Sequence, residues 1–261
     1  MRSLNVAATG MMAQQLNVEV ISNNIANMTT TGFKRSRPEF QDLLYQSLRR
    51  AGAESSSDGT VVPSGVQVGL GVKTAAVYRV SDQGDFVNTE NALDLAIQGE
   101  GYFAIQLPSG QTAYTRSGNL QLSPQGQIVT ADGYTVSPGI TVPPDAVEIA
   151  INAEGGITAK IANQSQLSNL GQLDLATFVN QAGLESIGSN LLIETDASGP
   201  PITGTPGSDG LGTVLQGYLE GSNVNPVQEI TALISAQRAY DMNSKVITAS
   251  DDMMATVTQM R

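Results

Sequence analysis

The chain has 261 residues, of which 40% are hydrophobic, and a formal net charge of −11. That length and that hydrophobic share are enough for a sizeable core, so we expect a folded chain rather than a disordered one. It contains no cysteine and no histidine. This excludes disulfides and cysteine metal sites, and it removes the commonest general base, which lowers the expectation of an enzyme.

The charge is unevenly distributed. Residues 71–221 hold 4 basic and 15 acidic side chains, a net of −11, whereas residues 1–70 carry +1 and residues 222–261 carry −1. Nearly neutral ends suit a crowded interface, and an acidic middle suits solvent and argues against nucleic-acid binding. No stretch approaches the ~20 apolar residues of a membrane span. Polar residues near the start break any secretory signal peptide, so these features alone predict a cytosolic protein with no direct membrane span.

The first predicted element is an amphipathic helix at the N-terminus. Ser3 can cap its start. The helix should end near Asn27, because three threonines follow and Gly32 can turn the chain. Its apolar side chains recur at heptad-like steps: Leu4, Ala8, Met11, Val18 and Ile25, with Ala7, Met12 and Ile21 beside them.

Residues 33–50 are expected to be partly extended and partly helical. The apolar members that could form a short helical face are Phe33, Phe40, Leu43, Leu44 and Leu48. The basic members Lys34, Arg35, Arg37, Arg49 and Arg50 are most simply a solvated face, although they could meet the acidic middle of a neighbour. Residues 51–65 are rich in Gly and Ser and predict a polar loop.

From Val66 to about Glu220 the pattern predicts β-structure. Short apolar runs are separated by turn signals such as Pro124-Gln125-Gly126, which is typical of an all-β sandwich or barrel-like domain. Asp196 to Gly212 is expected to be a surface loop. It lacks the spacing of a calcium-binding EF-hand, so a structural loop is preferred to a metal site.

The last forty residues predict a long helix that runs to Arg261. Asn225 is a good N-cap, Pro226 suits the first helical position, and Gln228 can bond back to the cap. Its apolar stripe is interrupted by Asn243 and Ser250 and consists of Leu233, Ala236, Tyr240, Ile247, Met254 and Val257, widened by Ile230, Ile234, Val246 and Met253.

Such a stripe needs a partner helix, and the simplest partner is the N-terminal helix. The alternative is a helix that covers one side of a globular domain. We therefore expect an α+β fold. Residues 1–34 and 222–261 pair as a coiled-coil-like core, residues 35–70 connect, and residues 71–221 form a central all-β domain.

No motif for catalysis, cofactor binding or metal binding is found. There is no phosphate loop and no dinucleotide fingerprint, and the neighbouring Ser244 and Lys245 splay apart on a helix. Asp251 and Asp252 are most simply a solvated face. We assign no catalytic residue, no cofactor and no metal.

Two short signatures carry a resemblance. Ser22 to Asn27, followed by Thr31 to Lys34, resembles the N-terminal signature of the flagellar axial proteins, the rod, hook and hook-associated subunits of bacterial flagella. Glu220 to Val227 and Ala236 to Tyr240 resemble the C-terminal signature of the same family, and residues 101–136 resemble the β domain shared by hook and rod subunits. The resemblance covers nearly the whole chain.

The resemblance implies a structural subunit of the distal rod in the flagellar basal body, where the rod spans the periplasm. Copies of such a subunit polymerise into a straight helical tube that transmits torque from motor to hook and encloses the export channel. The implied partners are like subunits, proximal rod subunits, hook subunits, the surrounding ring proteins that act as a bushing, and the flagellar type III export apparatus. Tyr45 to Gly69 resembles the rod version of a segment that braces neighbours, so residues 46–63 are expected to do so.

The apolar series and the signatures together place the expected subunit contacts on the two terminal segments. The alternatives are a hook or other rod subunit, or, in a different class, a soluble β-domain binding module or a carbohydrate-active enzyme. The expected interface residues are Leu4, Met11, Val18, Ile21, Asn24, Ile25, Asn27, Gly32, Phe33, Ile230, Leu233, Tyr240, Ile247 and Met254.

Overall fold

A computed structural model describes residues 2–50, 64–162, 167–208 and 210–259. The chain divides into two compact units. The helical unit comprises Met1–Ile25, Ser36–Tyr78 and Asn225–Arg261, and the β unit comprises Ala26–Arg35 and Arg79–Val224. By contacts, the turn after the first helix therefore goes with the β unit, and residues 36–78 go with the helices. The domain boundaries expected after residues 34, 70 and 221 stay predictions.

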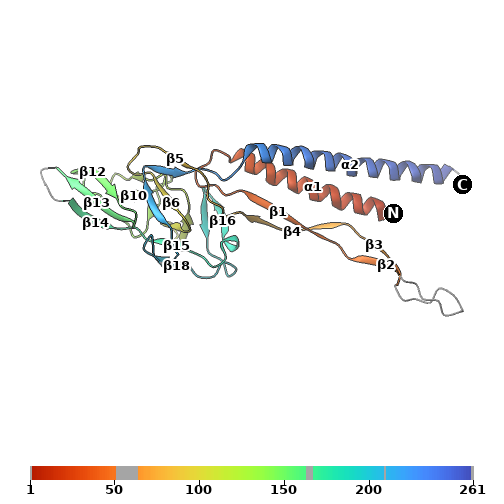
Figure 1. Ribbon diagram of the computed structural model, residues 1–261, viewed down its shortest axis with the longest axis horizontal. Coiled ribbons are helices and arrows are strands. Elements are labelled where there is room, and N and C mark those ends of the chain that lie inside the picture. The colour runs from red at the N-terminus through yellow and green to blue at the C-terminus, as the bar shows by residue number, and fades with distance from the viewer. Residues whose placement is uncertain (1, 51–63, 163–166, 209, 260–261) are drawn as a thin grey trace. The chain divides into compact units, whose positions relative to one another are not determined.

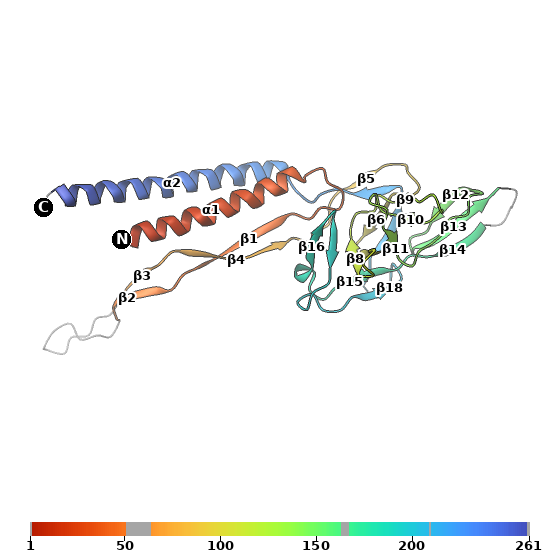
Figure 2. The same ribbon diagram turned by 180° about the vertical axis from the view of Figure 1, so that it is seen from behind.

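The helical unit holds two long helices and two short two-stranded sheets, in which β1 pairs with β4 and β2 with β3. Within this unit α1 and α2 run side by side and antiparallel, and the ribbon of β1 and β4 lies along α1 (Figures 1 and 2). Its elements are α1 (Arg2–Ala26), β1 (Ser36–Asp42), β2 (Tyr45–Arg49), β3 (Val66–Gly69), β4 (Val72–Arg79) and α2 (Pro226–Gln259).

The helix ends show which capping predictions hold. Helix α1 ends at Ala26, as expected, and Asn225 caps α2, because its Oδ1 accepts the N–H groups of Val227 at 3.1 Å and Gln228 at 3.2 Å. The cap assigned to Ser3 is wrong. Ser3 lies inside α1, and its hydroxyl accepts a hydrogen bond from Ser250 at 3.3 Å.

The short helix expected within residues 33–50 is also wrong, because these residues form β1 and β2. Along β1 the side chains are alternately half-buried and exposed, with Ser36, Pro38 and Phe40 on the more buried side. This period of two is that of a strand. Pro38 also opposes a helix interior, since it removes a backbone donor and clashes with the preceding turn. Of the predicted loop at 51–65, residues 51–63 lie outside the described residues.

The β unit is built on one large sheet with the order β16-β17-β8-β7-β11-β10-β9, to which β15 and β18 join through β7. Smaller sheets pair β12, β13 and β14, β6 with β19, and β5 with β20. The bounds are β5 (Phe86–Asn88), β6 (Leu95–Gln98), β7 (Tyr102–Gln106), β8 (Thr112–Thr115), β9 (Gln121–Leu122), β10 (Ile128–Val129), β11 (Thr135–Val136), β12 (Ala146–Ile151), β13 (Gly156–Ile161), β14 (Leu167–Gln172), β15 (Leu175–Thr177), the 3₁₀ turn η1 (Gln181–Gly183), β16 (Glu185–Gly188), β17 (Leu191–Ile193), β18 (Ile202–Gly204), β19 (Thr213–Gln216) and β20 (Tyr218–Glu220).

Strand β7 lies at the centre of the core because both of its faces are covered. Phe103 and Ile105 are fully buried in the main hydrophobic cluster, and Tyr102 lies in a second cluster on the other face. There Phe178 meets the ring of Tyr114 edge-on, with centroids 4.8 Å apart. A strand buried on both faces has a nearly continuous apolar sequence, as Tyr102 to Ile105 does.

No helix among the described residues is both long enough and apolar enough to cross a membrane.

Candidate functional site

The seam between α1 and α2 consists of small and polar residues. Asn24 Nδ2 donates to Glu229 Oε2 at 3.2 Å near one end of the pair. Near the other end Ser250 bonds to Ser3, and between them Gly10 lies against Asn243, whose Nδ2 is 2.9 Å from where a Cβ on Gly10 would be. Contact residues that are seven or fourteen positions apart on α1 meet residues the same number of positions apart, in reverse order, on α2. This defines an antiparallel register.

Most of the apolar stripe residues lie beside this seam; Ala236 is the exception, because it shares the seven-residue series of Glu229, Asn243 and Ser250 and is buried. On each helix the apolar stripe is rotated about the helix axis by roughly 40–100° from the seam residues, at ~3.6 residues per turn. In an antiparallel pair these rotations turn both stripes to the same side. The structure agrees, because Val18 of α1 and Tyr240 of α2 line one groove of about 420 Å³, together with Gln15, Glu19, Gln237 and Asp241. Tyr240 remains 42% exposed.

Helix α2 also extends past its partner. Because Ser250 faces Ser3, the residues after 250 lie level with, and then beyond, the first turn of α1. All of residues 251–259 are exposed, including Met253 at 58%, Met254 at 41% and Val257 at 67%. Eight residues of overhang correspond to ~12 Å of helix.

The expected interface residues divide by burial. Ile21, Asn24 and Gly32 are buried within their own units. Asn24 is fully engaged there, because its Oδ1 accepts the N–H of Ser36 at 2.8 Å and its Nδ2 donates to the Ser36 carbonyl at 2.9 Å as well as to Glu229. The half-buried members are Leu4, Met11, Val18, Ile25, Asn27, Phe33, Leu233 and Ile247, and the exposed members are Ile230, Tyr240 and Met254.

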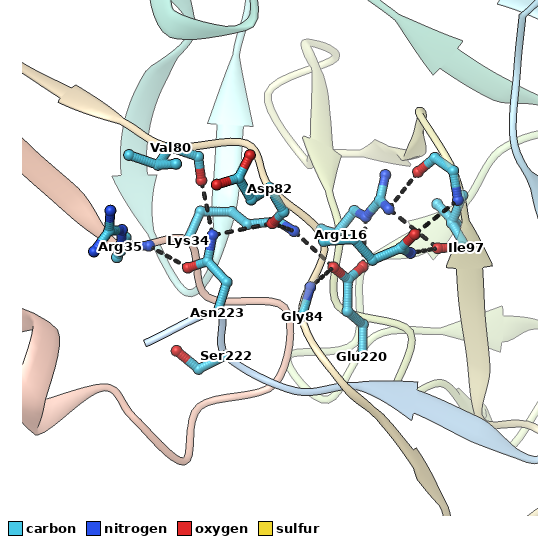
Figure 3. A network of polar contacts seen from close by, with 12 residues as sticks. Lys34, Arg35, Val80, Asp82, Gly84, Ile97, Arg116, Glu220, Ser222 and Asn223 are labelled. Carbon is cyan, nitrogen blue, oxygen red and sulfur yellow. Dashed lines mark hydrogen bonds and ion pairs between the residues drawn. The ribbon is translucent and has the colours of Figure 1, made fainter. Parts of the chain in front are cut away.

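A second candidate site lies inside the β unit, around the carboxylate of Glu220 (Figure 3). This side chain is fully buried, yet both of its oxygens are paired. Lys34 Nζ lies 2.6 Å from Oε1 and Arg116 Nε lies 2.6 Å from Oε2. The backbone N–H of Gly84 donates to Oε1 at 3.0 Å. The groups that bind the carboxylate come from three separate stretches of the chain, at Lys34, Gly84 and Arg116. The carboxylate itself belongs to β20, the last strand of the unit.

The rest of the Arg116 guanidinium binds backbone carbonyls, so its donors are used on protein. Nη1 donates to Gly101 at 2.6 Å, and Nη2 donates to Ile97 at 3.1 Å and to Gly99 at 2.5 Å. Arginine suits this position because its planar fork presents several donors at once. Arg116 therefore ties β6 and the start of β7 to β20.

Asn223 joins the same region from the C-terminal signature (Figure 3). Its Oδ1 accepts the N–H of Arg35 at 2.7 Å, and its Nδ2 donates to the carbonyls of Val80 at 2.9 Å and Asp82 at 3.0 Å. Lys34 also donates to the Asp82 carbonyl at 2.7 Å. The N-terminal signature, the C-terminal signature and residues 80–84 are thus held together at one place.

Sequence reasoning missed this cluster. Treating Lys34 as part of a solvated face was wrong, because its side chain is 9% exposed. Glu220 and Asn223 lie within the C-terminal signature, and this was the sequence feature that could have pointed to the cluster. Arg116 offered less, although it is one of only 4 basic residues among 19 charged ones in residues 71–221.

Burial alone raises the pKa of Glu220, but the charge of Arg116 and the hydrogen bonds from Lys34, Arg116 and Gly84 outweigh it and hold the pKa below the ordinary 4.5. Glu220 is therefore an anion at neutral pH. An ionised carboxylate whose two oxygens are both held by buried cations is a structural anchor rather than a general base. Among the described residues no group of three or more acidic side chains is placed to hold a metal ion.

Gly32, from the N-terminal signature, packs closely against neighbouring backbone within the β unit. Its φ is +68°, and a Cβ there would lie 2.8 Å from the backbone nitrogen of Ser117. Its N–H donates to the carbonyl of Glu220 at 2.8 Å. The position needs glycine for both conformation and space.

We expect Gly32→Ala to destabilise the β unit by more than the ~1–3 kcal/mol that a strained backbone alone costs. Gly133→Ala is the matched control, because Gly133 has φ +84° and no atom within 4 Å of its Cβ position. The midpoint of urea unfolding should fall clearly further for Gly32→Ala. Equal midpoints would show that the contact with Ser117 is easily relieved.

Comparison with known proteins identifies the same regions. Three family models match: "Flagella basal body rod protein" over residues 4–34, "Flagellar hook protein FlgE/F/G D1 domain" over residues 96–159, and "Flagellar basal body rod FlgEFG protein C-terminal" over residues 215–260.

Among similar proteins, the flagellar basal-body rod protein FlgG of Caulobacter vibrioides is 59% identical over 261 residues, which is 100% of both chains. FlgG of Borreliella burgdorferi is 45% identical over 263 residues, covering 100% of this chain and 99% of that protein. The flagellar hook-basal body complex protein FlhP of Bacillus subtilis is 32% identical over 274 residues, with both chains fully covered.

Proposed function

Because the chain belongs to the family of flagellar basal-body rod proteins, we propose that it is a structural subunit of the distal rod, one of many copies in a straight helical tube. The observation that supports polymerisation is the shared apolar face of the helix pair. A monomer gains nothing from exposing Tyr240, Ile230 and Met254 on one helix, whereas burying each such side chain stabilises by ~1.5–3 kcal/mol.

The proposed subunit interface is the side of the helix pair that carries both stripes. It is completed by the overhanging end of α2, whose exposed methionines have no α1 residue level with them. Large apolar faces of this kind on a long helix are buried by other helices in assemblies. The members that we place in contact with neighbours are Leu4, Met11, Val18, Ile25, Ile230, Leu233, Tyr240, Ile247 and Met254.

The ribbon of β2 and β3 is proposed to brace a neighbouring subunit. All five residues of β2 are exposed, with Tyr45 at 58% and Leu48 at 56%, and Val66 of β3 is 48% exposed. An isolated two-stranded sheet with apolar side chains in water is marginal, so such a ribbon gains most from a partner. The expected bracing role of residues 46–63 stays a proposal, since residues 51–63 lie outside the described part.

The family also supports the place and the partners. The proposed location is the flagellar basal body, and the proposed neighbours beyond like subunits are the proximal rod, the hook and the surrounding ring proteins, reached after passage through the flagellar type III export apparatus. The proposed role is mechanical: the subunit transmits torque from motor to hook and lines the export channel. The Glu220 cluster fits such a role, because its paired charges hold separate stretches of the β unit together.

Electron microscopy of the concentrated, purified chain tests this proposal. We expect straight tubes or rod fragments that form cooperatively above a critical concentration. A chain that stays monomeric at millimolar concentration, by sedimentation across a range of salt, would contradict self-assembly.

A further inference from the structure

The two helices contact each other through small and polar residues, not through large apolar ones. A stable coiled coil places apolar side chains at the repeating seam positions. Here the seven-residue series contributes Ser3, Gly10 and Asn24 from α1, and Ser250, Asn243 and Glu229 from α2. The larger apolar residues lie on an adjacent face of each helix, rotated by roughly 40–100° from these positions. Ala236 and Ile21 of the apolar series are buried within the subunit, whereas Ile230, Tyr240 and Met254 stay exposed and are left for contacts outside it.

The contact at Gly10 depends on the missing side chain. A Cβ would lie 2.9 Å from Asn243 Nδ2, 3.2 Å from Cγ and 3.3 Å from Oδ1. The carboxamide of Asn243 therefore lies against the bare backbone of α1. Gly10 has no positive φ, so a Cβ there is opposed only by its contact with the side-chain amide of Asn243, which would have to move aside. Glycine is the poorest helix former after proline, which makes it an unexpected residue in the middle of α1 unless the contact needs it.

The contact at Asn24 depends on register in a different way. The carboxylate of Glu229 is 5% exposed and receives the Asn24 amide, which β1 holds in place through Ser36. Sliding α2 by one turn, ~5.4 Å, would withdraw this amide from a buried carboxylate. The same slide would move Asn243 from Gly10 onto residues that carry a Cβ.

We propose that Gly10 with Asn243 and Asn24 with Glu229 set the register of the helix pair, and so keep both apolar stripes level on one face for a second copy of this chain. The inference rests on the proposed function and deepens it, because it names the residues that prepare the interface without belonging to it. The alternative that they prevent is a slipped or rotated pair that buries the stripes within one subunit.

The test measures register and assembly separately. The chain has no cysteine, so Ser22→Cys and Thr248→Cys can be spin-labelled uniquely. Both positions are exposed, and they are offset by ~26 Å along the pair, so a slide of one turn changes the distance by ~4–5 Å. Gly10→Ala is introduced in this background. The control is Asn5→Ala, an exposed position of α1 that gains helix propensity without touching the seam.

We expect Gly10→Ala to shift or broaden the distance and to raise the critical concentration for assembly at least tenfold, although alanine is the better helix former. Gly10→Ala combined with Asn243→Ala removes the clash and should restore both values, and Asn5→Ala should change neither. An unchanged distance in Gly10→Ala overturns the inference. If the distance shifts but the unsubstituted chain forms no tubes, the register role stands and the proposed function fails.

Discussion

Replacing Glu220 by glutamine is expected to destabilise the β unit by about 3–5 kcal/mol, the usual effect of removing one member of a buried ion pair. The amide cannot balance Lys34 and Arg116, which would then be two buried cations facing each other across a neutral group. It also places a donor where Oε1 or Oε2 accepts. Urea unfolding followed by tyrosine fluorescence reports this, because Tyr102 and Tyr114 lie in the β unit.

Glu148→Gln is the matched control, because Glu148 is an exposed carboxylate of β12 in the same unit. Its loss should change stability by less than ~0.5 kcal/mol. If Glu220→Gln were equally mild, the cluster would not anchor the two signatures, and the buried charges would have to be relieved by local opening.

The free energy of unfolding should also depend on pH through the Glu220 carboxylate. The folded-state pKa of Glu220 is lowered, so the unfolded chain binds this proton more readily than the folded one. The stabilisation is therefore complete above the ordinary pKa of 4.5 and is lost as the pH falls from there through the folded-state value. A plot of unfolding free energy against pH should fall less steeply in that window for Glu220→Gln than for the unsubstituted chain.

Tyr240→Asp is expected to abolish assembly while leaving the subunit folded. In the free subunit the side chain is 42% exposed, so an aspartate there stays hydrated. In the proposed tube the same carboxylate would be buried without a partner, and the apolar burial of the tyrosine would also be lost. These effects amount to several kcal/mol, and ~2.7 kcal/mol already corresponds to a hundredfold rise in the critical concentration.

Tyr240→Phe is the control at the same position, since it keeps the apolar ring and introduces no charge. It should assemble within a few-fold of the unsubstituted critical concentration, as measured by sedimentation. Normal tubes from Tyr240→Asp would remove this stripe from the subunit interface. Loss of the folded β unit in Tyr240→Asp would instead mean that the stripe serves the subunit's own core.

The sequence alone determined the elements whose signals are local. The cap at Asn225, the end of α1 at Ala26 and the doubly buried strand β7 follow from capping chemistry, turn residues and a continuous apolar run. The family signatures pointed to the correct family for the same reason, since each is a short contiguous motif. Where local signals conflicted, as in residues 36–49, the apolar spacing suggested a helix and the alternation around Pro38 was the better guide.

Only the tertiary structure decided which residues meet. Periodicity showed an apolar stripe on each terminal helix, but it could not show that Gly10 meets Asn243 and that Asn24 meets Glu229 between the two helices. Likewise, no local sequence feature around Lys34 or Arg116 indicates that they bind Glu220, which lies 186 residues from Lys34 and 104 from Arg116 in the chain. A helix has several faces and a charge several possible partners, and the choice among them depends on close packing between segments whose separation in sequence carries no local signal.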